Sequence, residues 1–224
     1  MQRILLSHIL RAGGPVYPGE PTLAVERRAD MEAGDDCNTA VLHLFNHFGT
    51  HVDGPRHFNA RGVPLAGLPA EAFVFSCVAL LDVPRSDNEL ISAGDLGAAL
   101  PGGWLCDLLL LRTGFGEVRG ADPERYVSRS PGLAPEAARM VMEELRTVRA
   151  IALDTISVGA PARPEEGREA HRVLCGEGRT DGRFVLIYED VNLAPLEDSP
   201  VRVWGLPLLV EGLDSAPATL VAEI

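Results

Sequence analysis

The hydrophobic residues of this chain fall into short runs, and most of these runs are typical of strands. Polar and apolar side chains alternate around Val41, His43 and Phe45, which is the pattern of a half-buried strand. The run over 73–83 is long and rich in Val and Leu, which predicts a buried central strand. The predicted strands cover residues 4–9, 22–28, 39–45, 73–83, 108–113, 150–153, 183–188, 201–204, 208–210 and 219–222.

Three segments have helical patterns instead. Ser92 is a suitable N-cap for a helix over 93–100, which Pro101-Gly102-Gly103 would end. Pro135 suits the first turn of a helix over 135–149, and a third helix is predicted over 165–174. Strands outnumber helices and no linker interrupts the chain, so the pattern predicts one domain over 1–224, of the α/β or α+β class.

Charge and composition exclude several classes of function. The chain has 20 Lys and Arg against 32 Asp and Glu, a formal net charge of −12, which argues against nucleic acids and anionic membrane surfaces as partners. No apolar stretch is long enough to span a bilayer, and the N-terminal apolar run is too short for a secretory signal, so we expect a cytoplasmic protein. The four cysteines are far apart, which indicates neither a zinc ribbon nor a disulfide framework.

The candidate chemistry lies in one short segment. Four of the six histidines fall between residues 43 and 57, and Asp53 lies among them. His51 and Asp53 are two residues apart, so in an extended chain they point the same way, while a turn at Gly49 would fold His47 toward them. Imidazole and carboxylate groups together suit Zn²⁺, Mn²⁺ or Fe²⁺. We therefore predict a metal site at His47, His51 and Asp53, with His57 held nearby by Pro55, whereas His8 and His43 suit ordinary surface or core positions.

The segment His47-Phe-Gly-Thr-His-Val-Asp-Gly-Pro-Arg-His57 resembles the HxGTHxDxPxH signature of the cyclase-like metal-dependent hydrolases, which include bacterial kynurenine formamidase and isatin hydrolase. Weaker marks of the same family follow along nearly the whole chain. They are Pro15–Glu20, Ile151–Ser157, the helix that begins near His171, Tyr188–Leu193, Leu206–Leu208 and Leu213–Pro217.

The resemblance implies a fold and a set of roles. The fold would be a single β-rich swivelling β/α/β domain, assembled as a homodimer or homotetramer. His47, His51 and Asp53 would bind a first metal, and Asp53 would also bridge to a second metal held by His171 and Glu189. Zinc or manganese, one or two ions per subunit, would be the cofactor, and His57 would be the general acid and base.

One departure from the family pattern affects the second metal. Residues Gly176–Gly182 lengthen the segment between His171 and Glu189. With that insertion, Glu177 and Asp190 become alternatives to Glu189 as the ligand.

Such a site predicts an amide hydrolase. A bound divalent metal lowers the pKa of water toward about 7, and a histidine can take the proton and return it to the leaving nitrogen. By resemblance the leading substrate is N-formylkynurenine, which would make the protein an arylformamidase that releases kynurenine and formate. Aromatic walls at Tyr17 and Phe48 would suit such a substrate, although ordinary packing also explains aromatic residues beside the signature.

Three alternatives stay open. The first is an isatin hydrolase-like enzyme or another cyclic-amide hydrolase. The second is a metal-dependent cyclase or dehydratase that stabilises an enolate. The third is a binding module with a structural metal, although structural zinc is usually closed by four protein ligands, often cysteine.

Overall fold

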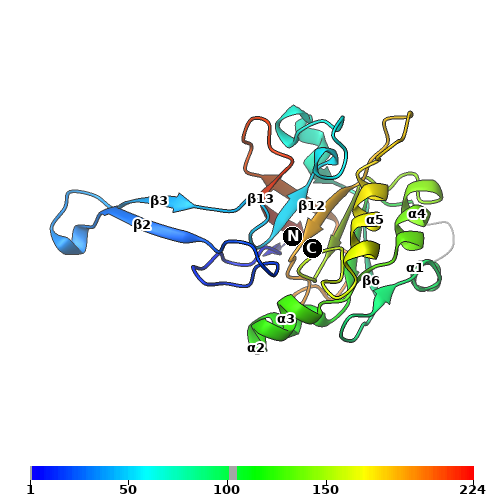
Figure 1. Cartoon of the computed structure of the whole chain (residues 1–224), viewed down its shortest axis with the longest axis horizontal. Helices are drawn as coiled ribbons and strands as arrows, with labels where there is room; N and C mark the ends of the chain where they lie inside the picture. The colour runs from blue at the N-terminus through cyan, green and yellow to red at the C-terminus, as the bar shows by residue number, and fades with distance from the viewer. Residues whose placement is uncertain (1, 101–104) are drawn as a thin grey trace.

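A mixed β-sheet runs through the computed structural model, which describes residues 2–100 and 105–224 (Figure 1). Within those ranges the sheet has nine strands, and β1 (Arg3–Leu5) pairs with β13 outside the main path. The spatial order along that path is β5 (Val74–Phe75), β12 (Arg202–Pro207), β13 (Ser215–Glu223), β4 (His51–Asp53), β11 (Leu186–Glu189), β10 (Ala150–Leu153), β8 (Leu108–Arg112) and β6 (Val78–Asp82).

The sheet changes character at β4. Strands β11, β10, β8 and β6 are parallel, whereas β4 is antiparallel to both of its neighbours, β11 and β13. Alternate residues of the parallel strands supply two cores, as the two-residue period of a strand requires. For example, Leu109 and Leu111 of β8 pack on the side of the helices, and Leu108 and Leu110 pack on the opposite side. The sequences of the parallel strands are therefore continuous apolar runs, because a core covers each face of this part of the sheet.

The helices are few and short. Helices α1, α4 and α5 pack on one face of the parallel strands (Figure 1). The described α-helices are α1 (Ala93–Ala99), α2 (Val118–Ala121), α3 (Pro123–Arg129), α4 (Pro135–Glu143) and α5 (Pro164–Leu174). Single 3₁₀ turns occur at η1 (Met31–Ala33), η2 (Pro55–His57), η3 (Leu65–Gly67), η4 (Ala70–Phe73) and η5 (Phe115–Glu117). None of the described helices is long and apolar enough to cross a membrane.

Several sequence predictions are confirmed. Ser92 caps α1 through a capping box with Asp95, and strands lie within or beside most of the predicted runs. The predicted stop at 101–103 lies outside the described residues. The two runs over 22–28 and 39–45 become β2 (Ala24–Ala29) and β3 (Thr39–His43), which pair only with each other within the described chain. They form an arm that projects from the body (Figure 1).

The prediction of one central strand over 73–83 is wrong. The run divides into β5, which pairs with β12, and β6, which lies at the far end of the sheet from β5. The break falls at Ser76 and Cys77, whose backbone N–H groups both donate to the carboxylate of Asp107. A side chain from elsewhere in the sequence thus replaces the strand partners of these two residues.

Two other predictions also need correction. The helix over 135–149 ends at Glu143, because carbonyl groups of its last turn and of the following turn accept hydrogen bonds from the guanidinium of Arg183. Residues 208–210 are not a strand but the exposed start of the loop between β12 and β13. The short pair β7 (Leu90–Ile91) and β9 (Gly132–Leu133) was not expected.

Candidate metal centre

The register of the sheet gathers the central side chains. His51 and Asp53 lie on the same face of β4, and β11 places Glu189 directly opposite His51. On the other side, β13 places Ser215 opposite Asp53. Residues directly opposite in an antiparallel pair share a face of the sheet. Three adjacent strands therefore present an imidazole, two carboxylates and a hydroxyl to one point.

The turn before β4 brings His47 back to this point. Gly49 has φ +67°, a backbone conformation that side chains other than glycine rarely adopt, so a larger residue there is strained. The turn sets His47 Nδ1 3.0 Å from Asp53 Oδ1. The position of His47 is as the spacing around Gly49 predicts.

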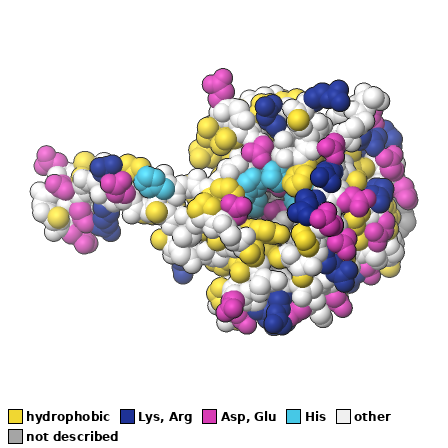
Figure 2. Space-filling model, in the orientation of Figure 1, with side chains coloured by type: hydrophobic (Ala, Val, Ile, Leu, Met, Phe, Trp, Pro, Cys, Tyr) yellow, Lys and Arg dark blue, Asp and Glu magenta, His cyan; other side chains and the backbone are white. Residues whose placement is uncertain are grey.

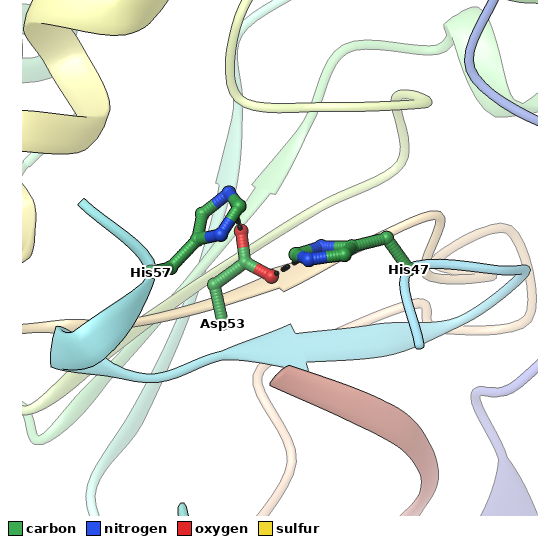
Figure 3. Close-up of side chains that lie close together, drawn as sticks. All are labelled: His47, Asp53 and His57. Carbon is green, nitrogen blue, oxygen red and sulfur yellow. Dashed lines mark ion pairs between the residues drawn. The ribbon is translucent and has the colours of Figure 1, made fainter. Parts of the chain in front are cut away.

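His57 approaches from the other end of β4. It closes the 3₁₀ turn η2, which begins at Pro55. Its Nδ1 lies 2.7 Å from Asp214 Oδ2, and its Nε2 lies 3.7 Å from Asp53 Oδ2. Figure 3 shows the Asp53 carboxylate between the two imidazoles of His47 and His57. His57 is thus oriented by one carboxylate and faces another.

The second predicted pair, His171 and Glu189, also meets here. His171 Nε2 lies 3.4 Å from Glu189 Oε1 and 3.7 Å from Asp53 Oδ2. Helix α5 can bring His171 this close because Gly167 packs directly on Gly159, where a Cβ on Gly167 would lie 2.8 Å from the other glycine's Cα. The insertion at Gly176–Gly182 forms a mostly exposed turn and does not move Glu189 away.

The tautomers of two imidazoles favour metal binding. His51 Nδ1 lies 2.8 Å from the carbonyl of Gly49, and His171 Nδ1 lies 2.8 Å from the carbonyl of Gly167. A carbonyl only accepts, so Nδ1 carries the proton in each ring and Nε2 faces the carboxylates. In a neutral ring that Nε2 has a free lone pair, which is how proteins usually prepare a histidine ligand.

The polar atoms at the centre lack the partners that buried groups normally have. His51 Nε2 and both carboxylate oxygens of Asp53 are buried and have no hydrogen-bond partner among the described residues. Such groups are rare unless an ion or water satisfies them. Two sets of possible ligand atoms lie within 4.8 Å of one another, namely His47, Asp53 and His57, and His51, Asp53 and Glu189. The donor set fits one or two divalent metals that share Asp53.

Charge coupling shifts the titration of the site. Burial lowers the pKa of His47, but the carboxylates of Asp53 and Asp214 more than offset this and raise it to about 10. Burial raises the pKa of Glu189, yet the neighbouring imidazoles of His171 and His51 hold it well below its usual range. In the metal-free protein at neutral pH, His47 is therefore protonated and Glu189 is ionised.

We expect metal binding to release protons. A metal must displace the proton from His47, so at pH 7.5 the first ion that binds to each subunit should release at least one proton. For each proton released, the apparent affinity for the metal should rise roughly tenfold per pH unit at pH values below about 10. Calorimetry in buffers of different ionisation enthalpy measures the release. His43→Gln, at an exposed histidine on the arm, should leave it unchanged, whereas a binding enthalpy that does not depend on the buffer would contradict the assignment of His47.

A cavity of about 540 Å³ opens onto the cluster. Figure 2 shows histidine side chains at a hollow near the root of the arm. Tyr17, which the sequence suggested as an aromatic wall, lines this cavity together with Phe45 and Phe58. Phe48 does not line it: the side chain is 1% exposed and packs inward against the loop at Gly14. Since the chain turns at Gly49, Phe48 and His47 leave the backbone in different directions.

Sequence reasoning missed two polar residues that orient the cluster. Asp214 accepts from His57 and also lies 3.4 Å from His47 Nε2. Ser157 Oγ donates to Glu189 Oε1 at 3.0 Å, and the backbone N–H of Val158 donates to the same oxygen at 2.6 Å. Asp214 and Ser157 both lie in segments that resemble the family. The resemblance therefore marked these segments, but it did not indicate that either side chain orients the histidines or Glu189.

The structure separates Glu189 from its two alternatives. Glu177 is exposed and pairs with Arg172 on the surface. Asp190 is fully buried but receives both a bidentate pair from Arg119, at 2.6 and 2.7 Å, and the hydroxyl of Tyr126 at 2.7 Å. Its carboxylate is therefore held by Arg119 and Tyr126 rather than by the histidines of the cluster. Glu189 is the acidic residue of this segment that faces the histidines.

Removing the partner of Asp190 should destabilise the protein. Arg119→Met leaves a buried carboxylate without its counter-charge, and we expect a loss of about 3–5 kcal/mol in the free energy of unfolding. Adding Asp190→Asn removes the uncompensated charge and should restore part of that loss. Urea denaturation of the metal-free protein measures both; equal stability of Arg119→Met and the unmodified chain would show that the pair contributes nothing.

Comparison with known proteins places this geometry in context. Residues 4–160 match the model of the family described as putative cyclase. Isatin hydrolase A from Labrenzia aggregata, solved with benzyl benzoate, superimposes with a TM-score of 0.82 at 23% identity over 99% of this chain and 93% of that one. Isatin hydrolase A from Ralstonia solanacearum gives 0.79 at 20% identity, over 99% and 91%. A predicted metal-dependent hydrolase from Bacillus stearothermophilus gives 0.75 at 22% identity, over 99% and 97%. These superpositions confirm that this chain has the α/β fold that the family resemblance implied.

Proposed function

Because the chain belongs to the putative cyclase family, we propose that it is a metal-dependent hydrolase that cleaves amide bonds with water. One observation carries this proposal. Imidazole and carboxylate groups from separate parts of the chain meet beside a cavity, and the buried atoms of His51 and Asp53 have no hydrogen-bond partner among the described residues. A structural metal site would be closed by its protein ligands, whereas this one faces an open cavity.

We assign the ligands as the family resemblance implies. His47, His51 and Asp53 would hold a first ion, and Asp53, His171 and Glu189 a second. Zn²⁺ and Mn²⁺ both suit nitrogen and oxygen donors. A divalent ion bound here supplies a water of pKa about 7 and polarises a substrate carbonyl.

His57 is placed to move the proton. Its Nδ1 donates to Asp214 at 2.7 Å, which fixes the ring and leaves Nε2 on the side of the Asp53 carboxylate. Nε2 would accept a proton from the attacking water and return it to the leaving nitrogen. Asp214 would stabilise the imidazolium that forms between the two transfers, as a carboxylate behind a histidine does in other hydrolases.

The walls of the cavity favour an aromatic amide. Tyr17, Phe45 and Phe58 line it, and His57 packs edge-on against Phe58 with ring centroids 4.7 Å apart. Aromatic faces suit an aryl group held next to the reacting carbonyl. We therefore propose arylformamidase activity on N-formylkynurenine as the first candidate. Hydrolysis of a cyclic amide such as isatin is the second, and it is supported by the likeness to the isatin hydrolases.

A substrate panel tests the proposal. Protein loaded with Zn²⁺ or Mn²⁺ is incubated with N-formylkynurenine, isatin and the aliphatic control N-formylglycine, and the products are identified by mass spectrometry in H₂¹⁸O. We expect ¹⁸O in the carboxyl product of an aromatic amide, with at least about tenfold slower turnover of the aliphatic control. A product without ¹⁸O would favour the cyclase or dehydratase alternative, and no product from any amide would overturn the proposal.

A further inference from the structure

One wall of the cavity is a single face of helix α5. Pro164, Gly167, Arg168 and His171 all line the cavity, and they follow one another at the three- and four-residue spacing of one helix face. His171 is buried beside Glu189, whereas Arg168, one turn earlier, is exposed. The helix therefore leads from the solvent to the cluster, and Arg168 lies about 4.5 Å before His171 along the helix axis.

The phenol of Tyr17 lies within electrostatic range of both the cluster and Arg168. Burial and the carboxylate of Glu189 raise the pKa of Tyr17, and the guanidinium of Arg168 partly offsets them. All three residues line the same cavity. An aryl group that packs against Tyr17 would therefore lie near the cluster and near the guanidinium.

Arg168 is a cation in an acidic cavity. Among the described residues that line the cavity it is the only Lys or Arg, whereas Glu20, Glu189 and Asp214 are acidic. In Figure 2 basic side chains lie beside the histidines at the hollow. The whole chain has a formal net charge of −12, which repels anionic substrates. A guanidinium is always charged, and its paired N–H donors match the two oxygens of a carboxylate. Arg168 therefore gives the mouth of the cavity a group that can hold a carboxylate against this repulsion.

The partner that Arg168 has within the chain does not prevent it from binding a substrate. Its Nη2 pairs with the carboxylate of Glu165, one turn earlier in α5, and the two side chains are 46% and 79% exposed. An exposed pair at this spacing contributes little to stability, because water and salt screen it. A carboxylate that enters the cavity can therefore replace Glu165 as the partner of the guanidinium without destabilising the helix.

We propose that Arg168 selects aromatic amides that carry a carboxylate remote from the scissile bond, by binding that carboxylate at the mouth of the cavity. This inference rests on the proposed function and separates its two candidate substrates. N-formylkynurenine has such a carboxylate in its amino-acid side chain, whereas isatin is neutral and has none. Because Arg168 contacts the substrate away from the reacting carbonyl, it is a specificity-determining residue, and its loss should change KM more than kcat.

Steady-state kinetics of the metal-loaded full chain test this selection with two matched substrates. The compound ortho-formamidoacetophenone has the ring, the ketone and the formamide of N-formylkynurenine but no carboxylate. Arg168→Gln should lower the ratio of kcat/KM for N-formylkynurenine to that for ortho-formamidoacetophenone at least about tenfold, mainly through KM. Arg168→Lys keeps the charge and should retain part of the ratio. Arg172→Gln, at an exposed arginine one turn later that pairs with Glu177, is the matched control and should leave the ratio unchanged.

Equilibrium binding separates this inference from the proposed activity. Calorimetric titration of the metal-loaded protein with the two corresponding amines, kynurenine and ortho-aminoacetophenone, measures recognition without turnover. We expect kynurenine to bind at least about tenfold more tightly, and Arg168→Gln to remove that advantage.

The two readouts fail in different ways. If neither amide is hydrolysed, the proposed activity is wrong, while an Arg168-dependent preference for kynurenine would still support the carboxylate site. If both amides are hydrolysed and Arg168→Gln changes neither the ratio of kcat/KM nor the preference in binding, the role of Arg168 is overturned, while the hydrolase proposal stands.

Discussion

Asp53→Asn should reduce the bound metal to less than about a tenth of its content in the unmodified protein and slow amide hydrolysis by about 10³-fold or more, the equivalent of roughly 4 kcal/mol in activation free energy. Both oxygens of Asp53 are buried and have no hydrogen-bond partner within residues 2–100 and 105–224, and both sets of possible ligand atoms include this carboxylate. An amide keeps the shape but presents an NH₂ group that cannot bind a cation. Metal content is measured after dialysis by plasma mass spectrometry.

The matched control for this prediction is Glu177→Gln. It makes the same kind of change at an exposed acidic residue that the sequence left open as a ligand and that pairs with Arg172 on the surface. It should retain full metal and full activity. Full metal content in Asp53→Asn, with normal folding, would mean that the cluster is not the metal site.

His57→Ala should retain metal but lose about 10²-fold or more in turnover. The reason is positional: Asp214 holds His57 Nδ1, and Nε2 lies 3.7 Å from Asp53 Oδ2. Asp214→Asn should reproduce part of the loss, since it removes the charge behind the ring and leaves the ring in place. Turnover and metal content are measured on the same samples.

The paired readout separates two roles for His57. The geometry also groups His57 with His47 and Asp53 as possible ligands. If His57 were a ligand, metal content and activity would fall together in the alanine variant. If it transfers protons, only activity falls and the metal content stays at that of the unmodified protein. Unchanged turnover would remove His57 from the mechanism.

The parts of the centre that are local in sequence could be predicted. Spacing alone places His51 and Asp53 on one face, and Gly49 marks the turn that returns His47. These are properties of a few successive residues, and the backbone geometry of a strand or a glycine turn decides them. For the same reason Ser92 correctly indicated the start of α1.

The parts of the structure that depend on contacts between distant residues could not be predicted from the sequence. Asp214 reaches His57 only because β13 pairs with β4, and no pattern around residue 214 specifies that pairing. The division of the run over 73–83 depends on Asp107, some thirty residues away. Phe48 failed as a wall residue because its direction is set by the turn at Gly49 and by packing against a separate loop. Each of these is a tertiary contact that local pattern does not contain.

The most direct test of the metal centre is an anomalous-scattering map from a crystal grown with Mn²⁺ or Zn²⁺. We expect at least one peak within about 2.2 Å of an Asp53 carboxylate oxygen and about 2.1 Å of an imidazole nitrogen of the signature. A second peak beside His171 and Glu189 would establish two ions. A map with no peak at Asp53, from protein that binds the metal in solution, would contradict the account.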